Sequence, residues 1–294
     1  MLYTYKTLAT KDNITEQSFY LACVLAWSAE LFQCLFNILD TIEDNRYAEN
    51  VQVKTLHLLP DAKAGANDVC LIISSIYEIL NIHFADKSSY NNVINLFNTA
   101  FLYKATGRHF DAIVSKATTG NYALFTTEQY DNIVYLYNTY STLHLPIYLG
   151  MTLAAKVNEK YMQDVQDICI DIGRLFQMQV EYQDCFGDGV MDKASNAIGN
   201  GKCTWLAVTA LQRCTRPQQI VFNSCYGSPE PAHMERIKEL YRKLKLPQIY
   251  HEQNRAIRKR IAQRIEALSQ NDKGETLPPE LFTDFLKQTI HDDK

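Results

Sequence analysis

Two clusters of acidic residues lie far apart in the sequence, and each follows a long apolar segment. The first runs from Asp40 to Asp44, and the second contains Glu181, Asp184 and Asp188. A carboxylate on an otherwise apolar helix is costly to bury unless another charge compensates it. Carboxylate oxygens together with substrate phosphates are the ligands that Mg²⁺ prefers. Two facing clusters would therefore form a magnesium site, and the chemistry they indicate is a reaction of a diphosphate.

The spacing within each cluster places its carboxylates on one helix face. Asp40 and Asp44 are four residues apart, as are Asp184 and Asp188, and Glu181 lies three residues before Asp184. Residues with these spacings are neighbours on a helix. A metal ion held there would neutralise a departing diphosphate. A pair of aspartates four residues apart is by itself more often a solvated face, and the apolar surroundings are what favour the metal site.

Two lysines follow the second cluster in the segment 187–202, which is the richest in loop-forming residues. Lys193 and Lys202 could bind phosphate oxygens through charge-assisted hydrogen bonds. Lysines by themselves say little, because most lysines in a protein are surface residues. The seven histidines show no spacing typical of metal ligands.

The composition limits the classes of protein to which the chain can belong. With 294 residues, of which 47% are hydrophobic, it can bury one large core. Its net charge of -4 argues against nucleic-acid binding. The eight cysteines include no C-x-x-C pair, so we interpret them as reduced thiols of a cytoplasmic protein. We expect no membrane span, because every apolar stretch of sufficient length has a polar interruption, and the N-terminus lacks a secretory signal.

The pattern of the chain is helical throughout. Glycine and proline are scarce, with 11 and 8 residues, and no segment alternates with period two. Helices are predicted over residues 16–45, 66–84, 89–116, 127–155, 160–187, 230–245, 248–269 and 278–290, with another starting near Cys203. Thr126 and Gln129 form a capping-box pattern, and Ser228 followed by Pro229 is typical of a helix start. We therefore predict an all-α protein with a single domain over residues 1–294.

Several motifs together resemble one known family. The stretch FQMQVEYQDCFGD (176–188), followed by KASNAIGNGKCTWL (193–206), resembles the second aspartate-rich motif of the farnesyl diphosphate synthases, which reads DDYLDCFGD, then a lysine, then NKCSWL. The segment 19–45 is similar to the family's first motif region. Shorter matches lie at 66–84, TGRHFD (106–111) and HLPI (144–147), so the resemblance spans roughly residues 5–290.

The resemblance implies a fold, a cofactor and a set of site residues. The implied fold is the all-α isoprenoid synthase bundle around a central cavity, with Mg²⁺ as cofactor, a prenyl diphosphate as substrate and a homodimer as assembly. Catalytic roles are implied for Asp40, Asp44 and Asp184, and metal binding for these three and Glu181. Diphosphate-binding roles are implied for Lys193, Lys202 and Gln177. Pocket positions are implied for Gln33 and for Phe36, which lies four residues before the first motif.

The sequence also departs from the family's pattern. Thr41 replaces the middle aspartate of the first motif, and Val180 replaces the first aspartate of the second. The family's arginine pair, which grips the diphosphates, corresponds here to Glu49 and Asn50. A lysine-threonine pair in the central helix is replaced by Tyr137-Asn138. The family's N-terminal basic segment, which helps bind isopentenyl diphosphate, has no counterpart in this sequence.

These departures affect the acceptor site more than the allylic site. An enzyme that ionises an allylic diphosphate without an acceptor would quench its cation with water, lose a proton or cyclise. We therefore predict a Mg²⁺-dependent class I terpene synthase that converts farnesyl or geranyl diphosphate, or geranylgeranyl diphosphate, to a terpene hydrocarbon or alcohol. The chain resembles the insect terpene synthases derived from farnesyl diphosphate synthases.

Two other hypotheses stay open. The first is a non-catalytic relative, either a decayed copy or a partner subunit, because Val180 cannot bind a metal ion. The second is an authentic prenyl diphosphate synthase that elongates its substrate, against which the altered acceptor site argues.

Overall fold

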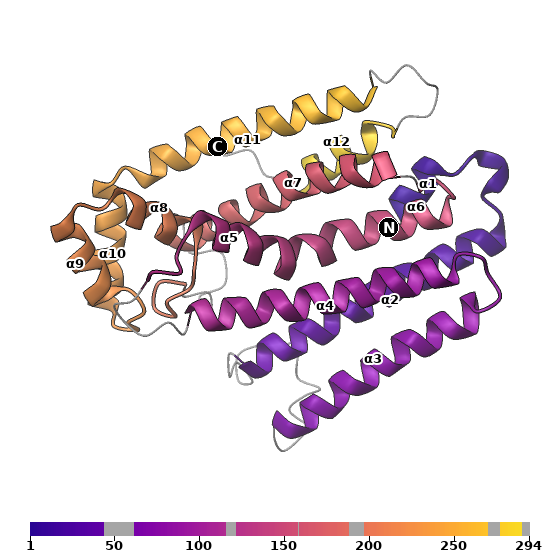
Figure 1. The fold of residues 1–294 in the computed structure, drawn as a ribbon, viewed down its shortest axis with the longest axis horizontal. Coiled ribbons are helices and arrows are strands. Elements are labelled where there is room, and N and C mark those ends of the chain that lie inside the picture. Colours follow the sequence, from indigo (N-terminus) through magenta and orange to yellow (C-terminus); the bar gives the residue numbers. More distant parts are fainter. Residues whose placement is uncertain (44–61, 116–121, 158, 188–196, 270–276, 290–294) are drawn as a thin grey trace. The chain divides into compact units, whose positions relative to one another are not determined.

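The computed structural model describes residues 1–43, 62–115, 122–157, 159–187, 197–269 and 277–289 (Figure 1). Across these residues helices follow one another and no strand occurs, so the prediction of an all-α protein is confirmed. The chain divides into two compact units. Unit 1 consists of residues 1–100 and 144–162, and unit 2 of residues 101–143 and 163–294. The assignment of a single domain over residues 1–294 stays a prediction.

Unit 1 is built around two long antiparallel helices. Its elements are α1 (Leu2–Leu8), η1 (Lys11–Asn13), α2 (Glu16–Glu43), α3 (Ala62–Phe84), the first part of α4 (Tyr90–Ser115) and α6 (Leu145–Leu153). Helix α2 buries Leu25, Phe32 and Phe36, whose spacing places them on one face. The ring of Tyr20, near the start of α2, lies 5.5 Å from that of His83, at the end of α3, so these two helices run in opposite directions.

Helix α2 is more apolar than we expected, because we predicted that no stretch is apolar over the length of a membrane span. The stretch Glu16–Asp40 is long and apolar enough to cross a membrane, and an 18-residue window within it has a mean hydropathy of 1.6. Core helices of globular proteins pass the same test, and 39% of that window is buried inside the protein. The packing of Phe32 against Phe97 of α4, at 6.5 Å between ring centroids, is of this core type.

Unit 2 contains the remaining helices. These are the rest of α4, then α5 (Thr127–Ile133), η4 (Val134–His144) without its last residue, α7 (Glu159–Phe186) without its first turn, α8 (Trp205–Arg213), α9 (Arg216–Cys225), α10 (Pro231–Lys243), α11 (Leu246–Ser269) and α12 (Glu280–Thr289). The single helix predicted over residues 127–155 is in fact divided, because its middle part, η4, is a π-helix. Such helices are rare and often occur at functional sites.

Two glycines allow η4 to approach its neighbours closely. A Cβ atom on Gly107 of α4 would collide with the backbone of Leu136 and Tyr137, and one on Gly173 of α7 would collide with the side chain of Thr139. Both neighbouring helices therefore contact η4 through positions that have no side chain. This packing fixes η4 against α4 and α7.

Of the two helix starts predicted from capping residues, the structure has the first at the expected place and the second two residues later. The Thr126 hydroxyl accepts a hydrogen bond from the amide of Gln129, as the capping pattern predicts. The start predicted at Ser228 is wrong by two residues, because α10 begins at Pro231 with Glu230 as its N-cap. A proline at the first helical position has a backbone preset for the helix, and this determines where α10 begins.

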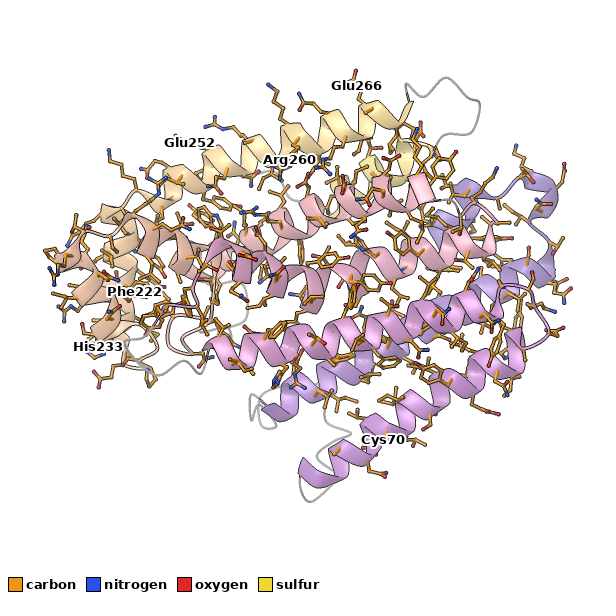
Figure 2. The ribbon with its side chains drawn as sticks, in the orientation of Figure 1. Cys70, Phe222, His233, Glu252, Arg260 and Glu266 are labelled. Carbon is orange, nitrogen blue, oxygen red and sulfur yellow. The ribbon has the colours of Figure 1, made fainter. Side chains whose placement is uncertain are left out.

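Helix α11 packs on α7 through ion pairs as well as apolar contacts. Asp171 of α7 is buried and bonds to Arg260, whose Nε lies 2.8 Å from Oδ2, and to Arg264 at 3.3 Å. Figure 2 shows Arg260 on the side of α11 toward α7, whereas Glu252 and Glu266 project away from it. Helix α11 therefore has one buried face, although most of its residues are polar.

Candidate functional site

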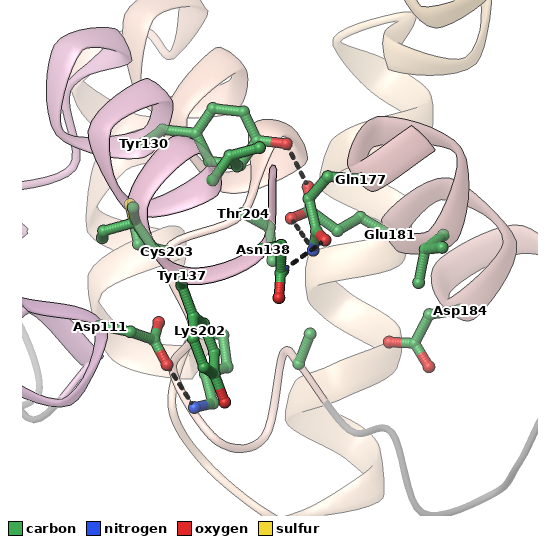
Figure 3. A pocket seen from close by; sticks show the side chains of 14 residues that line it. Asp111, Tyr130, Tyr137, Asn138, Gln177, Glu181, Asp184, Lys202, Cys203 and Thr204 are labelled. Carbon is green, nitrogen blue, oxygen red and sulfur yellow. Dashed lines mark hydrogen bonds and ion pairs between the residues drawn. The ribbon is translucent and has the colours of Figure 1, made fainter. Parts of the chain in front are cut away.

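A pocket in unit 2 brings together several of the predicted site residues (Figure 3). Its cavity volume is about 200 Å³, below the roughly 300–1,000 Å³ typical of sites that enclose a drug-sized ligand. Its walls come from α4, α5, η4, α7 and the segment before α8. The lining residues are Asp111, Tyr130, Ile133, Val134, Tyr137, Asn138, Gln177, Val180, Glu181, Asp184, Ala197, Lys202, Cys203 and Thr204. A space of this size suits a diphosphate group better than a whole prenyl chain.

The acidic wall of the pocket comes from α7. Glu181 is buried, and its Oε2 accepts hydrogen bonds from the backbone amide of Trp205 at 2.8 Å and from the hydroxyl of Tyr130 at 3.2 Å. Its Oε1 accepts from Nε2 of Gln177 at 2.9 Å, and Oε1 of Gln177 accepts in turn from Asn138 at 3.1 Å. Figure 3 shows this chain of contacts running from Tyr130 to Asn138.

The surroundings of Glu181 change its acidity. Burial raises the pKa of this carboxyl group from its usual 4.5 to about 7, although the hydrogen bonds from Gln177, Trp205 and Tyr130 act in the opposite direction. Burial and the charge of Glu181 also raise the pKa of the Tyr130 hydroxyl well above its ordinary value. The hydroxyl of Tyr130 therefore acts as a hydrogen-bond donor throughout the physiological range.

The basic wall of the pocket is Lys202. Its ammonium group lies 2.7 Å from Oδ2 of Asp111, and the carboxylate of Asp111 is the more buried of the two groups. The carbonyl oxygen of Lys202 accepts a hydrogen bond from the hydroxyl of Tyr226 at 2.6 Å, which holds the backbone in place. A diphosphate that enters the pocket would thus meet an ammonium group whose position is already fixed by Asp111.

A second ammonium group lies behind the pocket wall. Lys104 of α4 is only 6% exposed, which is unusual for a lysine. Its Nζ lies 3.3 Å from the hydroxyl of Ser141 and 5.7 Å from the centroid of the ring of Tyr137, which lines the pocket. This distance is within the range of a cation–π interaction.

The predicted site residues fall into three groups. Asp184, Glu181, Gln177 and Lys202 all line the pocket of unit 2. Asp40, Gln33 and Phe36 belong to α2 of unit 1, where Phe36 is buried and its ring lies 5.1 Å from that of Phe32. Asp44 and Lys193 lie outside the described residues. The catalytic, metal-binding and substrate-binding roles of all these residues stay predictions.

Of the two carboxylates that α7 contributes to the pocket, Asp184 is better suited than Glu181 to bind Mg²⁺. Asp184 has carboxylate oxygens at the pocket, as a magnesium ligand requires. Glu181 already accepts three hydrogen bonds, out of about four that a carboxylate can accept. Val180 also lines the pocket and offers no ligand atom. Over the described part of the chain, no group of three or more His, Cys, Asp or Glu residues is placed to hold a metal ion.

Sequence reasoning missed two members of the site. Asp111 is part of the TGRHFD match, but nothing in that match indicates its ion pair with Lys202. Tyr130 lies in an aromatic-rich segment that is equally typical of a packed core. The partners of both residues are 51 or more positions away along the chain, so local patterns could not identify them.

The chain matches the family model of polyprenyl synthetase over residues 1–244. It belongs to the polyprenyl synthetase family. Among its relatives, a farnesyl pyrophosphate synthase of Murgantia histrionica is 31% identical over 287 residues, which cover 97% of this chain and 69% of the relative. The mitochondrial farnesyl pyrophosphate synthase 1 of Arabidopsis thaliana is 32% identical over 250 residues, which cover 85% of this chain and 65% of the relative. The chain thus spans about two thirds of the length of these relatives.

Solved structures of the family have the same fold. A farnesyl pyrophosphate synthase of T. brucei is 25% identical, with a TM-score of 0.79 over 91% of this chain and 78% of that one. The same protein in complex with 2-(2,5-dichlorobenzo[b]thiophen-3-yl)acetic acid gives a TM-score of 0.84 over 99% of this chain and 84% of that one, at 24% identity. The predicted isoprenoid synthase fold is confirmed by these matches.

Proposed function

We propose that the protein is a prenyl diphosphate synthase, which joins an allylic prenyl diphosphate to isopentenyl diphosphate. The observation that carries this proposal is the pocket of unit 2, where Asp184, Gln177 and Lys202 line one small cavity at positions that match the family's second motif region. The names of the relatives, which are farnesyl pyrophosphate synthases, support elongation over the terpene synthase chemistry predicted from the sequence.

The proposed reaction assigns a task to each wall of the pocket. Lys202 would bind the diphosphate oxygens through charge-assisted hydrogen bonds, and Asp184 would bind Mg²⁺. When bound, Mg²⁺ would neutralise the charge that develops on the departing diphosphate. The carbon–oxygen bond of the allylic substrate breaks, and its diphosphate takes the electron pair. The double bond of isopentenyl diphosphate then attacks the allylic cation to form the new carbon–carbon bond, and a proton is lost. Ile133, Val134 and Val180 would keep water from the cation.

Class I terpene synthase activity is the second candidate, because specific substitutions favour it. Glu49 and Asn50 replace the family's arginine pair, and a carboxylate there would repel a second diphosphate. An enzyme changed in this way could still ionise the allylic substrate. A homodimer and a cytoplasmic location remain proposals for either activity.

A product assay separates these activities. The purified protein is incubated with Mg²⁺ and geranyl, farnesyl or geranylgeranyl diphosphate, each with and without isopentenyl diphosphate, and the products are identified by mass spectrometry. Elongation predicts a longer prenyl diphosphate that forms only with isopentenyl diphosphate. A terpene hydrocarbon or alcohol that forms without it would replace elongation by the second candidate. Folded protein without any product would support the non-catalytic relative instead.

A further inference from the structure

The carboxyl group of Glu181 connects the elements that form the pocket. It accepts hydrogen bonds from Tyr130 of α5, from Gln177 of α7 itself and from the backbone amide of Trp205. Gln177 extends the connection to Asn138 of η4. Glu181 therefore connects α5, α7 and the start of α8 directly, and η4 through Gln177. Figure 3 shows the contacts among Tyr130, Glu181, Gln177 and Asn138.

The contact with Trp205 fixes the segment that carries the basic wall. Trp205 is the first residue of α8, and its amide is one of those that the helix itself leaves without an acceptor. A carboxylate is also favoured at a helix N-terminus by the helix dipole. The hydroxyl of the N-cap residue Thr204 accepts from the amide of Ala207 at 3.1 Å, so side chains satisfy two amides of the first turn. Lys202 lies three residues before Trp205, and its position depends on where α8 begins.

We propose that Glu181 is a positioning residue of the pocket and not a magnesium ligand. It holds the start of α8, and with it Lys202, at a fixed place relative to Asp184 on α7. The inference rests on the proposed function only for the identity of the diphosphate ligand. If Glu181 turned its oxygens toward a metal ion, the buried amide of Trp205 and the side chain of Gln177 would lose their acceptor, which is unfavourable.

Three substitutions of Glu181 distinguish a positioning residue from a metal ligand. In Glu181→Gln, the new amide oxygen can accept from Trp205 and Tyr130, and its NH₂ group can donate to Gln177 once the amides of Gln177 and Asn138 turn over. In Glu181→Asp the carboxylate is kept, but it is one methylene too short to reach the amide of Trp205. Glu181→Ala removes the acceptor altogether. A positioning role therefore tolerates Gln better than Asp, whereas a magnesium ligand tolerates Asp better than Gln.

Two measurements show which of the three substitutions the protein tolerates best. Each variant is titrated with Mg²⁺ and inorganic diphosphate in a calorimeter, and its urea unfolding is measured without ligand. We expect Glu181→Gln to bind like the wild type, and Asp and Ala to weaken binding about 10- to 100-fold, as for other residues that orient a ligand. The matched control is Asp171→Asn, which removes a buried carboxylate ten residues earlier on α7, outside the pocket, and should leave binding unchanged.

Two outcomes would overturn the proposal. If Glu181→Gln loses Mg²⁺-dependent binding while Glu181→Asp keeps it, Glu181 is a metal ligand. If all three variants unfold at the same urea concentration as the wild type, the carboxyl group does not hold α8 in place. This second measurement requires no ligand, so it tests the positioning role even if the wild type binds no diphosphate and the proposed function fails.

Discussion

Helix α7 carries two buried carboxylates whose surroundings differ. Asp171 pairs with the guanidinium groups of Arg260 and Arg264 of α11, so its charge is compensated by full positive charges. Glu181, ten residues later, is bonded by neutral donors, namely two side chains and one amide. Neutral donors do not offset the cost of burying a charge at Glu181, and burial raises the pKa of its carboxyl group to about 7. Burial of an acid on a helix therefore does not by itself indicate a metal site.

The two carboxylates should differ most in how much their substitution lowers the free energy of unfolding. Glu181→Ala leaves the amide of Trp205, the side chain of Gln177 and the hydroxyl of Tyr130 without an acceptor in a buried place. Since each such loss costs about 1–3 kcal/mol, we expect the free energy of unfolding to fall by about 4 kcal/mol. Urea unfolding measures this loss, and a loss below about 1 kcal/mol would mean that water enters and satisfies these donors.

The raised pKa of Glu181 should also make the stability of the protein depend on pH. Because the pKa of Glu181 is about 7 in the folded protein and 4.5 in an unfolded chain, the folded protein holds a proton that the unfolded chain has released between these values. Its contribution to the free energy of unfolding therefore falls as the pH rises from about 4.5 to about 7, by on the order of 3 kcal/mol.

Unfolding curves measured across this pH range test this expected decrease in the free energy of unfolding. Glu181→Gln should remove the contribution of Glu181, so that stability falls less with rising pH. The control Asp171→Asn should leave the contribution of Glu181 in place. Identical pH profiles for the wild type and Glu181→Gln would contradict the assignment of the raised pKa to Glu181.

The packing of η4 against α7 can be tested at a position between the two carboxylates. Gly173→Ala introduces a methyl group that collides with Thr139, so η4 must shift. We expect a loss of about 2 kcal/mol in the free energy of unfolding, as for other overpacked sites. Combining Gly173→Ala with Thr139→Ala should recover part of the loss, and a double variant no more stable than Gly173→Ala would rule out this contact as the cause.

The smallest expected change comes from Asp171→Asn. The side chains of Arg260 and Arg264 are 45% and 37% exposed, so both can turn to water once their partner is neutral. Thermal and urea unfolding should show a loss of about 1 kcal/mol, near the upper end for exposed ion pairs. A loss as large as that of Glu181→Ala would remove the contrast between the two carboxylates.

Apolar periodicity predicts the long helices well. The bounds predicted for α2, α3, α4 and α7 lie within a few residues of those in the structure, because one buried face decides where each helix packs. The π-helical segment η4 could not be predicted in this way, because it depends on contacts that Gly107 and Gly173 make with residues distant in sequence.

The candidate site could be predicted only in part. The second motif region identified Gln177, Asp184 and Lys202, which line one pocket. The arrangement of Glu181 could not be deduced, because its main acceptor contact is with the amide of Trp205, 24 residues away. A backbone amide is present at almost every position, so the side-chain sequence does not show which one a carboxylate will bind.

Calorimetric titration with geranyl diphosphate and Mg²⁺ shows whether the pocket of unit 2 binds the diphosphate of a prenyl substrate. The wild type is compared with Lys202→Met and with Lys259→Met, a control that removes an exposed lysine of α11. Since Lys202 supplies a charge-assisted hydrogen bond of roughly 1.5–3 kcal/mol, Lys202→Met should weaken binding at least about tenfold, while the control binds like the wild type. Equal affinity of the wild type and Lys202→Met would contradict the assignment of the diphosphate to this pocket.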